Sequence, residues 1–295
     1  MGVQVLKQIS LKELLPFVDW SPFFRSWDLH GKFPKILKDK VIGEQATHLY
    51  EDAQKMMNNI IANQSLKPKA MFVLFEANTI NYDDISIQKK GKEIAIFRTL
   101  RQQSKKREGV PNIALADFIA ANDSGRTDYM GAFCVAIFGA DELTKAYKDN
   151  DDDYSAIMVQ AIADRFAEAF AEYLHKQVRT RHWGYSDQED LTNNELIKES
   201  YKGIRPAPGY PACPDHLEKE TIWKLLDVEK TIGVSLTESL AMWPAAAVSG
   251  YYFGSSEAKY FGLGKITKDQ IEDYAKRKGL TVSQVEGLLA SNLNY

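Results

Sequence analysis

The sequence is poor in cysteine and has no long hydrophobic run. Only Cys134 and Cys213 occur in 295 residues, so neither a disulfide framework nor a Cys-x-x-Cys metal or redox site can form. No stretch approaches the roughly 20 apolar residues that cross a bilayer. Residues 1–15 alternate apolar residues with Lys and Glu, unlike the core of a signal peptide. We expect a soluble, cytoplasmic protein with two reduced thiols and no membrane partner.

An excess of charge of one sign is also missing. The net charge is −3 and the pI is near 6.0, and Lys and Arg are scattered along the chain instead of gathered in runs. Proteins that bind nucleic acid usually carry a basic patch that neutralises phosphates. Nucleic acid is therefore not expected as a partner.

Motifs of the common catalytic and metal sites are absent. The sequence has neither a P-loop nor a His-Glu-x-x-His pair, and its five histidines lie far apart. Gly262-Leu263-Gly264 comes late in the chain and lacks the third glycine of a dinucleotide-binding loop. No Gly-x-Ser-x-Gly marks a hydrolase serine. We expect no catalytic side chain and no metal site, so that function depends on binding.

Helical patterns occur in the first half, the middle and the end of the chain. Apolar residues recur at three- and four-residue spacing in residues 43–62 and 154–179, which predicts amphipathic helices. Residues 217–229 also have helical character. Thr267 and Thr281 each precede a Gln by three residues, which is the pattern of a capping box at a helix start.

Runs with strand character are grouped together. They cover residues 70–75, 85–87, 94–97 and 129–138. Because strands and helices cluster instead of alternating one for one, the pattern predicts an α+β fold with a mostly antiparallel, twisted sheet flanked by helices.

Two further segments complete the expected organisation. Residues 246–253 and 259–263 predict a hairpin closed through Gly254, Ser255 and Ser256. Residues 1–40 are rich in aromatics and proline, which predicts an irregular N-terminal arm wrapped over a body formed by residues 41–295. We expect arm and body to form one domain over residues 1–295.

One segment has neither a helical nor a strand period. Residues 205–214 read Arg-Pro-Ala-Pro-Gly-Tyr-Pro-Ala-Cys-Pro, and we call them the prolyl strip. Its four prolines keep it extended, so its backbone amides and carbonyls can hydrogen-bond the edge of a flat ring at a low entropic cost. Arg205 adds a planar fork suited to a carboxylate, Gly209 permits close approach of a ligand, and Tyr210 offers a ring face. A stiff surface loop without a ligand is the alternative interpretation.

The prolyl strip resembles the Arg-x-x-x-Gly-Tyr loop of a known family, the C-terminal S-adenosylmethionine-binding activation (reactivation) domain of cobalamin-dependent methionine synthase. Further segments resemble that domain in the same order along the chain, and the likeness covers almost all of the sequence. These segments are residues 19–24 (Asp-Trp-Ser-Pro-Phe-Phe), 161–175, 182–185 (His-Trp-Gly-Tyr), 238–244 and 291–295 (Ser-Asn-Leu-Asn-Tyr).

The resemblance implies roles for individual residues. Arg205 matches the position that grips the methionine carboxylate, and Asp19 and Glu168 match acidic positions that contact the ligand's polar groups. Tyr260 matches an aromatic position near the adenosyl or sulfonium end, where a ring face favours a cation. Phe261 stands where the family leads us to expect a second Tyr. Further positions implied for the ligand are Tyr210 and Ala212 along the adenine, Ala207, and Glu199 as an acidic neighbour.

Taken one at a time, three of these residues have simpler interpretations. Asp19 could cap a turn before Pro22, Glu168 could be a solvated helix residue, and Tyr260 could be an ordinary strand aromatic.

The resemblance further implies a methyltransferase function. A protein with this function binds S-adenosylmethionine and donates its methyl group for the reductive remethylation of cob(II)alamin. This remethylation reactivates methionine synthase. The corrin-ligating Asp-x-His-x-x-Gly pattern is missing, because Asp28-Leu29-His30-Gly31 lacks the spacing. Cobalamin is therefore expected on another domain or chain, and the isolated chain is not expected to turn over.

Two points remain open from the sequence. The chain could be a fragment of a multidomain enzyme or a stand-alone reactivation subunit that meets a flavodoxin or a diflavin reductase. The alternative function is a non-catalytic docking module for flavodoxin or a corrinoid protein.

Overall fold

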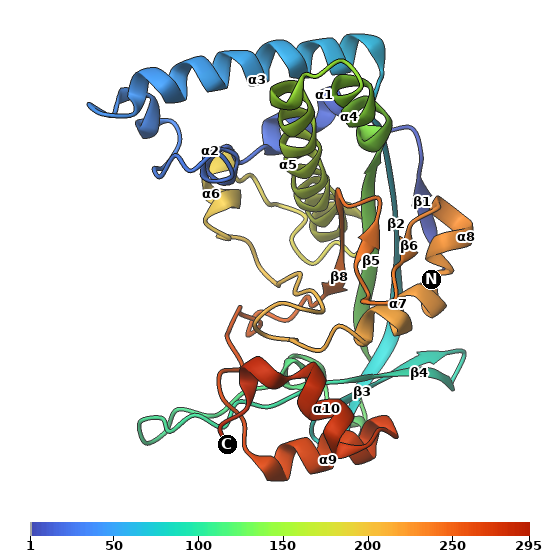
Figure 1. Cartoon of the computed structure of the whole chain (residues 1–295). Coiled ribbons are helices and arrows are strands. Elements are labelled where there is room, and N and C mark those ends of the chain that lie inside the picture. Colours follow the sequence, from blue (N-terminus) through green and yellow to red (C-terminus); the bar gives the residue numbers. More distant parts are fainter. Residues whose placement is uncertain (1) are drawn as a thin grey trace.

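The computed structural model describes residues 2–295, in which helices and one main antiparallel sheet form an α+β fold (Figure 1). The predicted fold class is therefore confirmed. The strands are β1 (Gln4–Leu6), β2 (Lys67–Ile80), β3 (Asp84–Lys89), β4 (Lys92–Arg98), β5 (Asp128–Phe138), β6 (Ser235–Leu236), β7 (Met242–Trp243) and β8 (Ala247–Tyr252). The helices are α1 (Leu11–Leu14), α2 (Ser21–Arg25), α3 (Gly43–Asn63), α4 (Ala140–Lys148), α5 (Asp153–Gln177), α6 (Asn193–Ile197), α7 (Glu218–Leu226), α8 (Val228–Ile232), α9 (Lys268–Lys278) and α10 (Val282–Leu288).

The main sheet has the strand order β4-β3-β2-β5-β8, and β1 also pairs with β2. Each of these pairs is antiparallel. The longest pairing joins β2 and β5, from Lys67 opposite Phe138 to Ala77 opposite Asp128. β8 pairs with β5 and forms one edge of the sheet, next to the N-terminal part of the prolyl strip.

Helices cover both faces of this sheet. On one face, Phe72 and Leu74 of β2 belong to the same buried cluster as Phe166 and Phe170 of α5. On the other face, Met71, Val73 and Phe75 pack in a second cluster with residues of α7 and α8. Both sides of β2 are therefore buried, which explains why its sequence is a continuous apolar run and not an alternation.

The ends of the molecule are closed by helices of different origin. Figure 1 shows α3 lying across one end of α5 at the top of the molecule, whereas α9 and α10 lie at the opposite end of the molecule. The latter pair has its own cluster of buried residues with Leu100. Within residues 2–295, no helix combines the length and the apolar character that crossing a bilayer requires.

The predicted N-terminal arm consists of short pieces and not of one long helix. β1, α1, α2 and the 3-10 turns Leu15–Phe17 and Lys35–Lys38 precede α3. Its rings pack on one another and on Tyr50 of α3, with ring centroids 5.3 Å apart for Trp20 and Phe23 and 4.9 Å apart for Trp20 and Tyr50. The arm thus contributes buried aromatic surface to the main core.

The predicted hairpin is wrong. Residues 259–263 form no strand, because the position beside β8 is taken by the start of the prolyl strip. Tyr251 donates its backbone N–H to the carbonyl of Pro206 (2.9 Å), and Ile204 and Phe253 exchange two backbone hydrogen bonds of 3.0 Å. A Cβ on Gly250 would lie 2.5 Å from the Pro206 oxygen, so this glycine permits the close approach.

Two helix predictions need correction at their ends. The helix predicted over residues 154–179 ends at Gln177 and continues as the π-helix Val178–His182. The helix predicted over residues 217–229 divides into α7 and α8 at Asp227, which has a left-handed φ of 51°. By contrast, the capping box predicted at Thr281 is present.

Thr267 begins α9 without the predicted capping box. Gln270, which should reach back to Thr267, instead pairs with the backbone of Arg101, accepting its N–H (2.7 Å) and donating to its carbonyl (2.8 Å). Gln103 accepts the Thr267 N–H in its place (2.7 Å). A tertiary contact has therefore replaced the local one.

Candidate ligand-binding site

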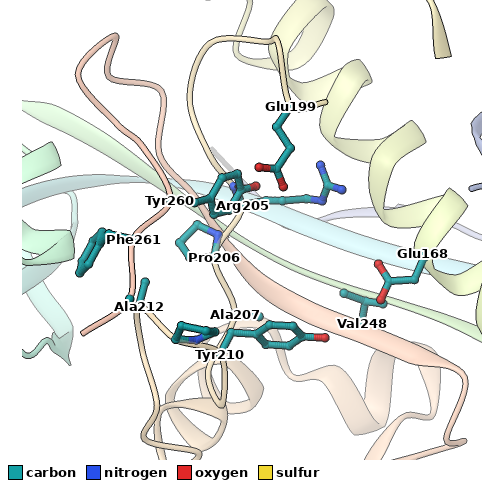
Figure 2. A pocket seen from close by; sticks show the side chains of 12 residues that line it. Glu168, Glu199, Arg205, Pro206, Ala207, Tyr210, Ala212, Val248, Tyr260 and Phe261 are labelled. Carbon is teal, nitrogen blue, oxygen red and sulfur yellow. The ribbon is translucent and has the colours of Figure 1, made fainter. Parts of the chain in front are cut away.

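A cavity of about 520 Å³ opens between α5, the prolyl strip, β8 and residues 260–262. Its size is typical of small-molecule sites. Figure 2 shows the side chains that surround it, which come from four separate parts of the chain. Every predicted site residue except Asp19 lines it. The lining residues are Glu168, Glu199, Arg205, Pro206, Ala207, Tyr210, Pro211, Ala212, Val248, Tyr260, Phe261 and Gly262.

The prolyl strip is held along one wall by its backbone. The Arg205 N–H donates to the hydroxyl of Tyr260 (3.0 Å), and the Leu263 N–H donates to the carbonyl of Pro211 (2.8 Å). These two bonds place the segment around Tyr260 beside the strip. Tyr260, which the resemblance placed near the adenosyl or sulfonium end of the ligand, therefore also fixes the Arg205 backbone through its hydroxyl.

A tight turn follows at Gly209. This residue has a φ of 94°, and its N–H donates to the Cys213 carbonyl (2.7 Å). A Cβ at this position would lie 2.2 Å from a ring carbon of His216. Glycine is thus required here both for the left-handed backbone and for the contact with His216.

Some backbone groups of the strip have no protein partner. Within residues 2–295, no hydrogen bond involves the N–H or the carbonyl of Ala212, or the N–H of Ala207. Ala212 is only 5% exposed and lines the cavity. Buried backbone groups are normally paired, so Ala212 offers a donor and an acceptor to the edge of a flat ring.

Arg205 carries the positive charge of the cavity. Its Nη1 lies 2.7 Å from the Glu172 carboxylate and donates to the hydroxyl of Tyr201 (2.8 Å). It also lies 3.3 Å from Nδ1 of His175. Burial is the largest single influence and lowers the pKa of the Arg205 guanidinium, but the Glu172 carboxylate acts together with Tyr201, Tyr260 and Glu168 to raise that pKa on balance. Arg205 is therefore a permanent cation.

A second arginine lies behind the cavity. Arg179, in the π-helix, is fully buried and donates from Nε and Nη2 to the Glu189 carboxylate, at 2.7 Å for each bond. Its Nη2 also lies 3.4 Å from Glu172, so Glu172 is shared between Arg179 and Arg205. The guanidinium of Arg179 stacks over the ring of Tyr201 at 4.1 Å. Buried charges survive only when paired in this way.

His175 is a neutral member of this group. Burial, together with the positive charges of Arg179 and Arg205, holds the pKa of His175 well below its usual value of 6.5. Its ring is stacked on Tyr252, with centroids 5.1 Å apart and planes inclined by 13°. The neutral imidazole of His175 thus contacts the Arg205 side chain without adding a second positive charge beside it.

Two carboxylates face the cavity from different elements (Figure 2). Glu168 comes from α5, and Glu199 comes from the loop before the prolyl strip, where its φ is 56°. Burial raises the pKa of Glu199, against the opposing effect of Arg205. The cavity therefore combines one cation with two acidic groups, which suits a ligand that carries charges of both signs.

Asp19 lies outside the set of residues that line the cavity. Its Oδ1 accepts the backbone N–H of Ser21 (2.9 Å), which is the turn-capping role that the sequence also allowed. The second carboxylate oxygen, Oδ2, makes no hydrogen bond within residues 2–295.

Sequence reasoning missed the residues behind Arg205. The missed residues Glu172, His175 and Arg179 follow the predicted Glu168 at spacings of four, three and four residues, so all four share one stripe of the helix and its π-helical extension. Polar residues recurring on one stripe of an Ala- and Phe-rich helix were the available signal. Tyr201 had no comparable signal.

Two comparisons with known proteins identify the family of this chain. The sequence model of the family described as "Vitamin B12 dependent methionine synthase, activation domain" matches residues 10–279. The chain belongs to this family. A solved structure, described as the "MetH Reactivation Domain bound to AdoHcy", is 50% identical to this activation domain with a TM-score of 0.96. The superposition covers 100% of the present chain and 91% of the other. The family resemblance found in the sequence is therefore confirmed.

Proposed function

We propose that this activation domain binds S-adenosylmethionine in the cavity and presents its methyl group for the reductive remethylation of cobalamin. The observation that carries the proposal is the combination, in one cavity, of the Arg205 guanidinium, the unpaired backbone of Ala212 and two carboxylates. The related reactivation domain, described as bound to AdoHcy, supports a ligand of this class.

Each chemical group of the ligand finds a complementary group in the cavity. The Arg205 fork matches the methionine carboxylate, because guanidinium and carboxylate pair through two parallel hydrogen bonds. The backbone of Ala207 and Ala212 matches the polar edge of adenine. Glu168 and Glu199 match the ammonium, the sulfonium or the ribose hydroxyls. Tyr210, Tyr260 and Phe261 would contact the ligand through their rings or backbone. Asp19 would contact the ligand through Oδ2, which has no hydrogen bond within residues 2–295.

The chemistry asks little of the side chains beyond binding. Cobalamin held on another domain or chain, and reduced by one electron from the reductase partner, would supply the nucleophile to which the methyl carbon bonds. The sulfur–methyl bond breaks, and the cationic sulfonium becomes the neutral thioether of S-adenosylhomocysteine. No proton moves, so the domain contributes orientation and charge and no acid or base. The implied partners are the cobalamin-binding domain and a flavodoxin or diflavin reductase, in the cytoplasm.

Calorimetric titration of the chain with S-adenosylmethionine tests the binding. We expect saturable heat with one site per chain, and we expect Arg205→Ala to weaken binding by about 100-fold, as for loss of one partner in a buried charge pair. Circular dichroism must show that the variant is folded. Absence of saturable heat with folded wild-type protein would rule the proposal out.

A second experiment tests the methyl transfer. The chain is mixed with a cobalamin-bearing partner, an electron donor and S-adenosylmethionine labelled in its methyl group. Label is expected on cobalamin only when all components are present, and none with the chain alone. Capture of flavodoxin by a chain that fails to bind S-adenosylmethionine would instead support the docking module.

A further inference from the structure

The polar contacts of Arg205 are distributed unevenly over its guanidinium. Nη1 forms an ion pair with the Glu172 carboxylate at 2.7 Å and hydrogen bonds with the Tyr201 hydroxyl at 2.8 Å and His175 Nδ1 at 3.3 Å. Within residues 2–295, neither Nε nor Nη2 of Arg205 makes a hydrogen bond. Nη1 is therefore occupied by protein partners, whereas the edge formed by Nε and Nη2 has none in the described part of the chain.

This distribution limits how Arg205 can hold a carboxylate. A guanidinium binds a carboxylate with two parallel bonds either through Nη1 and Nη2 or through Nε and Nη2. Since Nη1 is committed to the protein, the first arrangement would break the contacts with Glu172 and Tyr201. The edge formed by Nε and Nη2 remains for the ligand.

We propose that Glu172 is a positioning residue that holds Arg205 by Nη1 and so turns its Nε and Nη2 edge toward the ligand carboxylate. The inference rests on the proposed function, because it concerns the same cavity. Glu172 is itself only 7% exposed and accepts from Nη2 of Arg179, and Arg179 is in turn bound to Glu189 through Nε and Nη2. The contacts that link Glu189, Arg179, Glu172 and Arg205 thus fix the position of the Arg205 guanidinium in the cavity wall.

His175 completes this support, and its tautomer follows from its neighbours. A guanidinium can only donate, so Nδ1 of His175 accepts from Arg205 and the ring proton resides on Nε2. Nε2 lies 3.4 Å from the hydroxyl of Tyr185. A protonated imidazole would place a donor against a donor at Nδ1, which agrees with the lowered pKa of His175.

The test separates an effect through Arg205 from a general effect on folding. Calorimetry is performed with S-adenosylmethionine and with decarboxylated S-adenosylmethionine, which keeps the sulfonium, amine, ribose and adenine but lacks the carboxylate. For Glu172→Gln we expect the affinity for S-adenosylmethionine to fall roughly 10- to 100-fold, the range for a hydrogen bond to a charged group. The affinity for the decarboxylated ligand should change less than about threefold, since Arg205 has no carboxylate to hold.

Three variants sharpen the test. Glu172→Gln added to Arg205→Ala should cause no further loss, because Glu172 acts through Arg205. Tyr201→Phe, which removes one partner of Nη1 and keeps the ring, should show the same selectivity for the carboxylate-bearing ligand with a smaller loss, and it answers the case in which Glu172→Gln does not fold. Glu51→Gln, exposed on α3, is the matched control and should leave both affinities unchanged.

The outcomes are distinct. Equal losses for the two ligands, or no loss for S-adenosylmethionine in folded Glu172→Gln, would overturn the positioning role and leave the proposed function intact. Failure of the wild-type chain to bind S-adenosylmethionine would overturn both.

Discussion

The N-terminal arm and the prolyl strip are both rich in proline and aromatics, yet they are used differently. The arm turns its rings inward, so that Phe23 and Phe24 are almost completely buried. The strip leaves Tyr210 57% exposed and keeps backbone groups of Ala212 unpaired beside a cavity. The arm has thus become part of the core, and the strip has become one wall of the cavity.

The difference arises from what lies behind each segment. The arm packs on α3 and α5, which present an apolar surface. The first part of the strip lies against the edge of β8, which fixes its course through backbone hydrogen bonds and leaves its opposite side free. Proline and aromatic content therefore indicates an irregular segment, and the neighbouring element decides whether it packs or binds.

Removing a ring from the arm should have the largest effect, and on stability alone. Phe24→Ala deletes a fully buried ring and should lower the free energy of unfolding by about 3–5 kcal/mol. Urea unfolding monitored by circular dichroism measures the change. At a temperature where the variant stays folded, its affinity for S-adenosylmethionine should equal that of the wild type. A large loss of affinity would show that the arm and the strip are coupled.

The segment that follows the prolyl strip should contribute to stability in a pH-dependent way, whereas the arm should not. Asp215 and Glu218, just after the strip, both lie 2.7 Å from Lys278 of α9. Burial raises the pKa of Glu218 to about 7 from 4.5, although Lys278 opposes the rise. Because the folded state holds this proton more tightly than the unfolded chain, the stability contributed by Glu218 is greatest below pH 4.5 and is lost as pH rises toward 7.

The comparison of Glu218→Gln with wild type isolates this contribution. We expect the difference in unfolding free energy between the two proteins to change by a few kcal/mol, on the order given by linkage, between pH 4.5 and pH 7.5. Urea unfolding across this range provides the measurement. A difference that stays constant with pH would mean that Glu218 has an ordinary pKa.

Displacing the strip from the sheet should cost less stability but should damage binding. Gly250→Ala places a methyl group 2.5 Å from the Pro206 oxygen, and such overpacking typically costs about 1–3 kcal/mol. Because Arg205 precedes Pro206, we expect the affinity for S-adenosylmethionine to fall as well. Gly287→Ala is the control, since no atom lies within 4 Å of the added Cβ. Unchanged affinity in Gly250→Ala would show that the strip does not depend on β8.

The smallest effect is expected at Asp19, the one predicted site residue in the arm. Asp19→Asn keeps an oxygen to accept the Ser21 N–H and removes the charge, so stability should change by less than about 0.5 kcal/mol. Loss of the contact through Oδ2 should lower the affinity for S-adenosylmethionine severalfold. An Asp19→Asn variant with wild-type affinity would limit the residue to capping its turn.

The sequence predicted much of this molecule, and the failures share a cause. Helix α3 and strand β3 follow from local periodicity, and strands β4 and β5 follow from apolar runs. Both signals depend only on the residues of each element. The hairpin failed because Pro206 occupies the edge of β8, and the Thr267 capping box failed because Gln270 binds Arg101. In both cases a partner distant in sequence displaced a local one.

The candidate site divides in the same way. Arg205, Gly209 and Tyr210 are recognisable in the sequence because a stiff extended segment and its residue types are local properties. Only the tertiary structure decided that Glu172, rather than the ligand, takes Nη1 of Arg205, because Glu172 and Arg205 lie on different elements and meet through packing. The residue types of the site and the local conformation of the strip follow from the sequence. The direction in which the Arg205 guanidinium faces depends on the groups that the fold brings around it.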